Sequence, residues 1–182
     1  MNSRFTAVSK RSFSALYNYS NAANPRVYFT VASGEHKVGD LVFELYSDKQ
    51  PAAAENFKTL LQGAVEGKSF VGTHFTKGMA GLGVIGGRID HENNGAFGTL
   101  NPDGDLNLRH YKRGLLTTTN DGPNHNGGEF MITFTEAAFL DGYQTVFGEL
   151  VEGDQVLAEI EKHVDRHGAV KGDLSIVAGG HK

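Results

Sequence analysis

A loop of turn-forming residues between two apolar segments is the part of the sequence best suited to chemistry. The loop, residues 120–128, reads N-D-G-P-N-H-N-G-G, and these residue types favour turns over a continued strand. Such a loop exposes backbone N–H groups and short polar side chains at the edge of a sheet, where an extended peptide can bind through main-chain hydrogen bonds. The loop alone leaves two interpretations open, a peptide-binding edge or an ordinary solvated loop.

Strands are predicted on both sides of this loop and elsewhere in the chain. Five segments are rich in β-branched, aliphatic and aromatic side chains, as strands prefer: 27–31, 41–45, 115–119, 130–134 and 174–178. Because every second residue of such a segment can face a core, we expect the strands to share one hydrophobic interior.

Two helices complete the predicted set of elements. The first covers residues 51–62, with Pro51 in its first turn and Gly63 at its C-terminal cap. The second runs from about Asp154 to His163 and places Val156, Leu157 and Ile160 on one face. Many short strands with two helices predict a mainly β fold, an all-β barrel capped at its ends.

Two short patterns suggest other chemistry but lack the context that it needs. Residues 81–86 match G-x-G-x-x-G, yet residues 87–95 contain helix breakers where a dinucleotide site requires a helix. Residues 103–107 begin like a calcium loop, but Leu108 and Gly114 occupy the positions that require glycine and glutamate. We therefore expect no dinucleotide site at residues 81–86 and a loop in place of a calcium site at residues 103–107, with no metal or other cofactor.

Composition narrows the function classes further. The chain has 182 residues, a formal charge of −4 and no extended run of one sign, so no nucleic-acid partner is expected. It has no cysteine, which excludes disulfides and thiolate metal sites. It also has no run of 18 apolar residues, so no membrane span is expected. The eight histidines form no clear ligand set and are expected at the surface.

The N-terminal segment differs from the rest of the chain. Residues 1–24 contain Arg4, Lys10 and Arg11 and no acidic residue, the first being Glu35. A basic, Ser-rich and acid-poor composition is typical of a mitochondrial presequence, although a disordered basic tail is the alternative. We expect a mitochondrial protein with an extension over residues 1–24, followed by one domain over residues 25–182.

Two longer motifs give a family resemblance. Residues 114–132 (G-L-L-T-T-T-N-D-G-P-N-H-N-G-G-E-F-M-I) resemble the cyclophilin pattern G-I-L-S-M-A-N-x-G-P-N-T-N-G-S-Q-F-F-I. Residues 139–148 (F-L-D-G-Y-Q-T-V-F-G) resemble W-L-D-G-x-x-V-V-F-G, which follows it in that family. Residues 38–61 are similar to the family's opening strand and first helix. The resemblance implies an eight-stranded closed antiparallel barrel capped by two helices, and rotation about X–Pro bonds as the activity.

The resemblance also implies where the site lies. It puts Lys77 at the position of the catalytic arginine and Asn120 at the residue that holds the substrate through its backbone. The peptide- and proline-binding positions are Phe75, Leu82, Ile85, Thr119, Glu129, Met131, Phe139, Leu140 and Gln144.

Several of these positions depart from the family. An X–Pro bond has a rotation barrier of about 18–20 kcal/mol, and the twisted state presents a prolyl nitrogen that needs a well-aimed donor. Lys77 is a flexible point charge where the family has a rigid guanidinium, and Ile85 replaces the glutamine that orients it. Glu129, at a second glutamine position, is expected to pair with Lys77 and draw it away. Gly83 replaces a methionine and is expected to leave a gap in the proline socket.

Two hypotheses of different classes follow. In the first, the protein has weak or no isomerase activity and serves as a binding or structural subunit of a larger mitochondrial complex, held through residues 1–24. In the second, it is an active peptidyl-prolyl isomerase that assists protein folding, with Lys77 as a weakened catalyst. A protein or peptide partner is expected in both cases.

Overall fold

Alternating inward and outward side chains produce the first strands. In β1 (Arg26–Ser33), the side chains of Val27, Phe29 and Val31 are completely buried, as expected when every second residue of a strand faces a core. β2 (His36–Leu45) pairs with β1 in antiparallel register. The two strands predicted in this part of the chain are confirmed.

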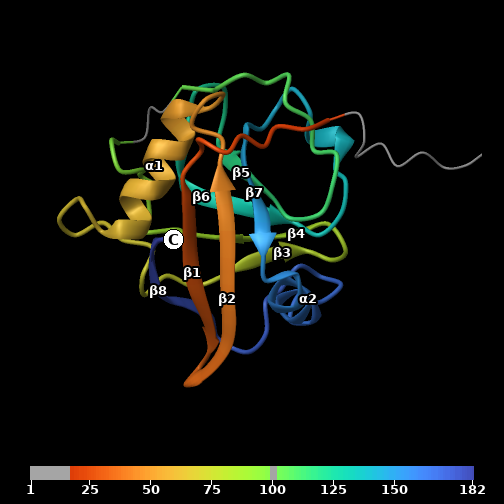
Figure 1. The fold of residues 1–182 in the computed structure, drawn as a ribbon. Helices are drawn as coiled ribbons and strands as arrows, with labels where there is room; N and C mark the ends of the chain where they lie inside the picture. Colours follow the sequence, from red (N-terminus) through yellow and green to blue (C-terminus); the bar gives the residue numbers. More distant parts are fainter. Residues whose placement is uncertain (1–16, 99–101) are drawn as a thin grey trace, which may run out of the picture.

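The computed structural model describes residues 17–98 and 102–182. Within these residues the strands form one eight-stranded antiparallel sheet in the order β3-β4-β6-β5-β7-β2-β1-β8 (Figure 1). The remaining elements are α1 (Pro51–Gln62), β3 (Lys77–Met79), β4 (Gly83–Gly86), β5 (Leu115–Asn120), β6 (Asn126–Thr133), the short 3-10 helix η2 (Ala138–Leu140), β7 (Val146–Glu152), α2 (Asp154–Lys162) and β8 (Leu174–His181).

The sheet curls until its two edges meet, which gives the predicted barrel. β3 and β8 are the edge strands, and the segment just before β3 bonds to β8. The N–H of Phe75 donates to the carbonyl of Leu174 at 2.9 Å, and the N–H of Ile176 donates to the carbonyl of Thr73 at 2.9 Å. These bonds satisfy backbone groups that an open edge would leave unpaired.

Both predicted helices are present, with nearly the predicted bounds. α1 has Pro51 in its first turn and ends at Gly63, whose φ of 61° is the left-handed conformation that glycine adopts without strain. α1 contacts β6, β7 and β8, and α2 contacts β2. α2 ends at Lys162, one residue before the predicted end.

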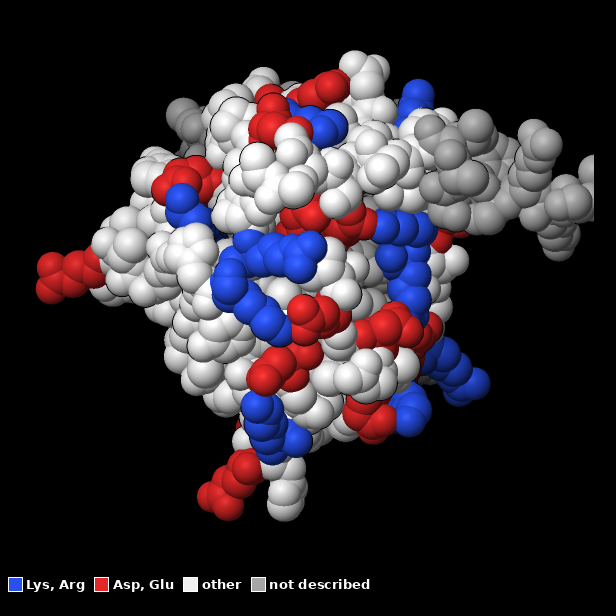
Figure 2. Space-filling model, in the orientation of Figure 1, with Lys and Arg blue, Asp and Glu red and all other residues white. Residues whose placement is uncertain are grey.

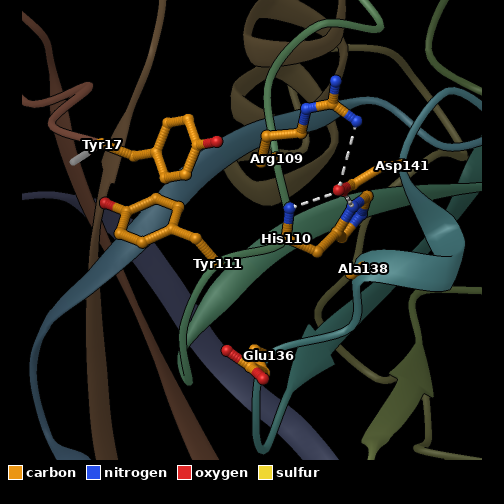
Figure 3. Close-up of a pocket in the computed structure, with 7 residues that line it drawn as sticks. All are labelled: Tyr17, Arg109, His110, Tyr111, Glu136, Ala138 and Asp141. Atoms are coloured by element: carbon orange, nitrogen blue, oxygen red, sulfur yellow. Dashed lines mark hydrogen bonds and ion pairs between the residues drawn. The ribbon is translucent and has the colours of Figure 1, made fainter. Parts of the chain in front are cut away.

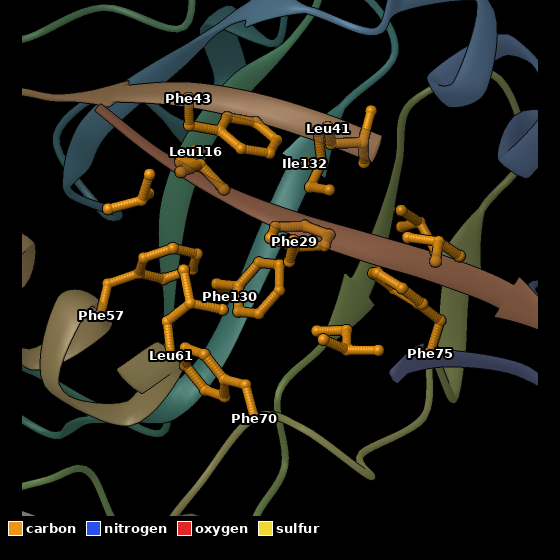
Figure 4. Packing of buried hydrophobic residues seen from close by; sticks show 14 of the residues in the cluster. Phe29, Leu41, Phe43, Phe57, Leu61, Phe70, Phe75, Leu116, Phe130 and Ile132 are labelled. Carbon is orange, nitrogen blue, oxygen red and sulfur yellow. The ribbon is translucent and has the colours of Figure 1, made fainter. Parts of the chain in front are cut away.

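Aromatic side chains fill the barrel interior (Figure 4). The ring centroid of Phe57 on α1 lies 5.0 Å from that of Phe130 on β6 and 5.1 Å from that of Phe70. Phe29 on β1 lies 6.0 Å from Phe130. Because these rings come from separate parts of the chain, the core joins α1 to the sheet, and each ring pair contributes about 0.5–1.5 kcal/mol beyond the burial of its area.

The loop after β5 is shorter than the sequence predicts. We expected residues 120–128 to lie outside the strands, but β6 begins at Asn126, so the last three residues of the loop belong to the sheet. The two glycines are needed there because another segment crosses closely. A Cβ at Gly127 would collide with the carbonyl oxygen of Asn93. Close backbone approach, and not turn formation, accounts for this glycine.

The described end of the N-terminal extension lies against the barrel. Glu44 on β2 is only 2 % exposed, and its carboxylate accepts hydrogen bonds from the hydroxyl of Ser20 at 2.8 Å, the N–H of Asn21 at 2.7 Å and the amide of Asn24 at 3.1 Å. Residues 17–24, which we call the strap, therefore satisfy a buried charge. The basic residues of the predicted presequence fall within residues 1–16, outside the described part, and the domain boundary after residue 24 stays a prediction.

Charges of both signs are interspersed over the face that carries β1, β2, β7 and α2 (Figure 2). Arg113, just before β5, holds two carboxylates of α2. Its Nε lies 2.8 Å from Asp154 Oδ1, and its Nη1 lies 2.6 Å from Glu161 Oε2. This guanidinium thus links the helix to the barrel.

Candidate functional site

Three predicted site residues form a row across neighbouring strands. Lys77 on β3 is paired with Ile85 on β4, and Ile85 is paired with Met131 on β6. Directly paired residues share one face of a sheet. This is the outer face of the barrel, because Phe130 and Ile132, on either side of Met131, belong to the interior cluster. The structure therefore brings these residues together as predicted.

Lys77 lies at the end of this row without a partner among the described residues that would hold its side chain. Its side chain is exposed at the edge strand and makes no hydrogen bond or ion pair with any described residue. Its cross-strand neighbour Ile85 can neither donate nor accept. An ammonium on a four-carbon stem without a partner samples many rotamers, so its aim at a substrate nitrogen is not held.

The expected gap at Gly83 does not exist. A Cβ built on Gly83 would stand 3.1 Å from both Cγ and Sδ of Met131, so the methionine side chain occupies that space. Met131 itself is completely buried. A flexible thioether fills irregular space well, and the floor of the predicted socket is therefore filled. Lys77, Ile85 and Met131 line none of four surface hollows in the described residues, which have volumes of about 20, 250, 310 and 320 Å³.

Glu129 pairs with Arg88, and the predicted pair with Lys77 is wrong. The Nε of Arg88 donates to Glu129 Oε1 at 2.8 Å, and its Nη1 donates to the carbonyl of His91 at 3.0 Å. This bond to Glu129 is the main cause that raises the pKa of Arg88. Thr119 lies beside the pair, with its hydroxyl 3.5 Å from Glu129 Oε2. The cause of the error is register, since Glu129 lies two residues along β6 from the residue that faces Ile85.

The other side of the predicted site is the turn between η2 and β7. The side-chain amide of Asn120 donates to the carbonyl of Tyr143 at 2.6 Å and ties the end of β5 to this turn. Phe139 and Tyr143 are 63 % and 74 % exposed, so two aromatic rings stand free at this edge. Leu140 is half-buried, and Gln144 Oε1 is buried with no hydrogen-bond partner among the described residues.

Two predicted peptide-binding residues do not belong to this outer face. Phe75 is 3 % exposed and its ring lies 6.3 Å from that of Phe130, so it belongs to the core and does not line the outer face. Leu82 is half-buried in the turn between β3 and β4. The outer face thus retains Ile85 and Thr119 as its partly accessible members, whereas Glu129 is buried.

A histidine that we expected at the surface is buried. The ring Nδ1 of His110 donates to Asp141 Oδ1 at 2.9 Å, and its Nε2 lies 2.9 Å from the hydroxyl of Thr117 on β5. Burial lowers the pKa of His110, while the hydrogen bond and charge of Asp141 oppose that shift. The sequence analysis missed this residue, and no spacing pattern marks it.

His110 forms the floor of the cavity of about 310 Å³ (Figure 3). Arg109 and His110 converge on Asp141, and the rings of Tyr17 and Tyr111 lie side by side with centroids 5.6 Å apart. Ala138 of η2 also lines this cavity, so η2 separates it from the face that carries Phe139.

Comparison with known proteins agrees with the motifs. The family model described as cyclophilin type peptidyl-prolyl cis-trans isomerase/CLD matches residues 28–179. The chain is also similar to a protein of Encephalitozoon cuniculi named peptidyl-prolyl cis-trans isomerase, with 36 % identity over 153 residues that cover 82 % of this chain and 88 % of the relative. The chain belongs to the cyclophilin-type peptidyl-prolyl cis-trans isomerase family.

For a cyclophilin, the chain has an altered outer face. The cyclophilin pattern places an arginine where this chain has Lys77, and the only guanidinium joined to the predicted peptide-binding residues, within the described part, is that of Arg88. Arg88 was not predicted as a site residue, because its link to Glu129 spans 41 positions and depends on how β4 and β6 align.

Three further observations concern cofactors and membranes. The dinucleotide-like pattern at 81–86 contains β4, and no helix follows it in residues 87–95. No cluster of three or more potential metal ligands occurs in residues 17–98 and 102–182. Across the same residues no helix is both long and apolar enough to cross a bilayer.

Proposed function

We propose that this cyclophilin is a peptide-binding protein with weak or no isomerase activity, which serves as a binding or structural subunit of a larger mitochondrial complex. The observation that supports weak activity most directly is the state of Lys77. It stands at the position of the family's catalytic arginine without a hydrogen-bond or ion-pair partner among the described residues.

The size of the expected loss in catalytic rate follows from the stabilisation of the transition state. Twisting an X–Pro bond leaves a lone pair on the prolyl nitrogen, and a preorganised donor stabilises that state more than the planar one. Removing one such donor typically costs about 10²- to 10³-fold in rate. Here the donor Lys77 has no partner in the described part of the chain, and Ile85 stands beside it without a group that could orient it. Met131 also fills the floor of the socket.

Peptide binding has separate support. Ile85 and Thr119 are partly accessible on the outer sheet face, and Asn120 ties the end of β5 to the turn that carries the exposed rings of Phe139 and Tyr143. Backbone groups of such a loop and exposed aromatic rings can hold extended peptides through main-chain bonds and apolar contact. Binding of this kind does not require a donor at the prolyl nitrogen, so it can remain when catalysis is lost.

An active isomerase is the second candidate. The relative from Encephalitozoon cuniculi is named a peptidyl-prolyl cis-trans isomerase, and an ammonium retains some ability to donate to the prolyl nitrogen. In that case Lys77 would act as the electrostatic catalyst.

One sample can distinguish binding from turnover. The isotope-labelled full chain is titrated with a capped Ala-Ala-Pro-Ala peptide, while cis-trans exchange is followed in the peptide's own NMR spectrum. We expect saturable shifts at residues of β4 to β6 and little acceleration of exchange. Exchange as fast as with an active family member would favour the second candidate, and a lack of any saturable shift would contradict peptide binding.

The mitochondrial complex is tested separately. The composition of residues 1–24 supports import, and the native protein should then co-migrate with a large assembly in a mitochondrial extract. Migration only as a free monomer, or recovery only outside mitochondria, would contradict this part of the proposal.

A further inference from the structure

Arg88 presents a fixed guanidinium beside the row of Lys77, Ile85 and Met131. We propose that Arg88 is the residue that binds the peptide backbone, donating from Nη2 to a carbonyl of an extended segment that has no acidic side chain near the contact. This inference rests on the proposed peptide binding, and it adds which residue makes the contact and which class of peptide fits it.

The position of the guanidinium follows from its two bonds. Glu129 and Met131 are two residues apart on β6, so their side chains share the outer face and lie about 7 Å apart along the strand. Arg88 Nε is 2.8 Å from Glu129 Oε1. The guanidinium therefore lies next to the filled floor of the socket, on the side of Thr119 and the loop after β5.

The remaining donor is free to bind. Nε is used by Glu129 and Nη1 by the carbonyl of His91, whereas Nη2 has no partner among the described residues. The Arg88 side chain is 33 % exposed, while that of Glu129 is 7 % exposed. A planar group held at two points loses little rotamer freedom on making a third bond. Lys77, by contrast, would have to be ordered first.

The surrounding charges determine which acceptor fits. Besides Glu129, the carboxylates of Asp121 and Asp90 act on Arg88. Three carboxylates thus act on one guanidinium, and Lys68 acts in turn on Asp90, so carboxylates outnumber the cations within this group. A neutral carbonyl can accept from Nη2 in this setting, whereas an incoming Asp or Glu meets repulsion, and an incoming Lys or Arg meets attraction.

The test compares peptides and variants by NMR titration of the full chain. The probes are capped Ala-Ala-Pro-Ala and two versions in which the first Ala is replaced by Glu or by Lys. The variants are Arg88→Gln combined with Glu129→Gln, which leaves no unpaired buried carboxylate, and Arg88→Lys, which keeps the charge but loses the fork. Arg113→Gln is the control, since Arg113 is likewise an ion-paired guanidinium, but its partners Asp154 and Glu161 belong to α2.

We expect the double variant to bind the neutral peptide about tenfold more weakly than wild type, as for one lost hydrogen bond to a charged donor. The affinity of Arg88→Lys for the neutral peptide should fall between those of wild type and the double variant, and that of Arg113→Gln should match wild type. Wild type should bind the Lys peptide at least as well as the neutral one and the Glu peptide most weakly. Unchanged affinity in both Arg88 variants, with wild type still binding, would overturn this inference alone. Absence of binding to all three peptides by wild type would overturn the proposed function as well.

Discussion

Lys77 and Ile85 face each other across β3 and β4. The strand neighbour that could orient a catalytic cation is therefore an aliphatic side chain, which offers no hydrogen bond. The fold of a cyclophilin is complete around this pair, so the proposed loss of isomerase activity concerns a few side chains and should be open to repair.

Restoring the donor and its partner should raise isomerase activity. Lys77→Arg combined with Ile85→Gln supplies a rigid fork and a group that can hold it, so we expect at least about a tenfold gain in kcat/KM, part of the 10²- to 10³-fold worth of such a donor. Lys77→Arg alone should gain less. A proline-limited peptide assay gives the rates, with Lys171→Arg as the control because that lysine is exposed and outside the row. No gain in the double variant would mean that the filled socket is the main defect.

Met131 should contribute strongly to stability. Because the side chain is completely buried and fills the space over Gly83, Met131→Ala should lower the free energy of unfolding by about 2–5 kcal/mol. Urea denaturation of the two proteins measures the difference. A change well below that range would show that the socket is open and that the methionine is loosely packed.

The strap should be needed for a stable domain. A chain that starts at residue 25 leaves the buried carboxylate of Glu44 without its bonds to Ser20, Asn21 and Asn24. We expect it to be less stable than a chain that starts at residue 17 by about 3 kcal/mol, since each lost bond to a charged group is worth about 1.5–3 kcal/mol and solvent replaces part of them. Urea unfolding of both chains tests this.

A second substitution checks the cause. In the shorter chain, Glu44→Gln should recover part of the lost stability because no buried charge then remains unpaired. Equal stability of the two chain lengths would show that the strap contributes nothing to the fold.

His110 should make stability depend on pH. Its pKa in the folded protein is lowered, mainly by burial, so the unfolded chain binds more protons. The contribution to stability is then fully present above the ordinary histidine pKa of about 6.5 and is lost as pH falls below it, by at most about 1.4 kcal/mol per pH unit. We expect wild type to lose more stability than His110→Gln between pH 7.5 and pH 5.5 in urea unfolding. Equal losses would contradict this assignment, and a larger loss in the variant would reverse its sign.

Local sequence signals predicted both helices and several strands, because they act over a few residues, but they did not mark β3 and β4. Proline and glycine at the ends of α1 set bounds that the structure reproduces, and apolar alternation marked β1 and β2. Contacts that depend on the register between strands could not be predicted from local sequence signals. Glu129 meets Arg88 and not Lys77 because of how β4 and β6 align.

The sequence also could not show which residues are buried by segments that lie elsewhere in the chain. His110 is enclosed by Asp141 and Thr117, which come from two other parts of the chain, and nothing beside it in the sequence announces this. The prediction of a gap at Gly83 was wrong for a related reason. The sequence gives the size of each side chain, but it does not show that Met131 turns into the space over Gly83.

The most direct test of this account is the catalysed rate of prolyl isomerisation by the unmodified chain, measured beside the relative from Encephalitozoon cuniculi in one proline-limited peptide assay. The state of Lys77 predicts a kcat/KM lower than that of an active cyclophilin by about 10²-fold or more. A value within about tenfold of an active relative would contradict the account, because an unheld ammonium beside Ile85 would then be a sufficient catalyst.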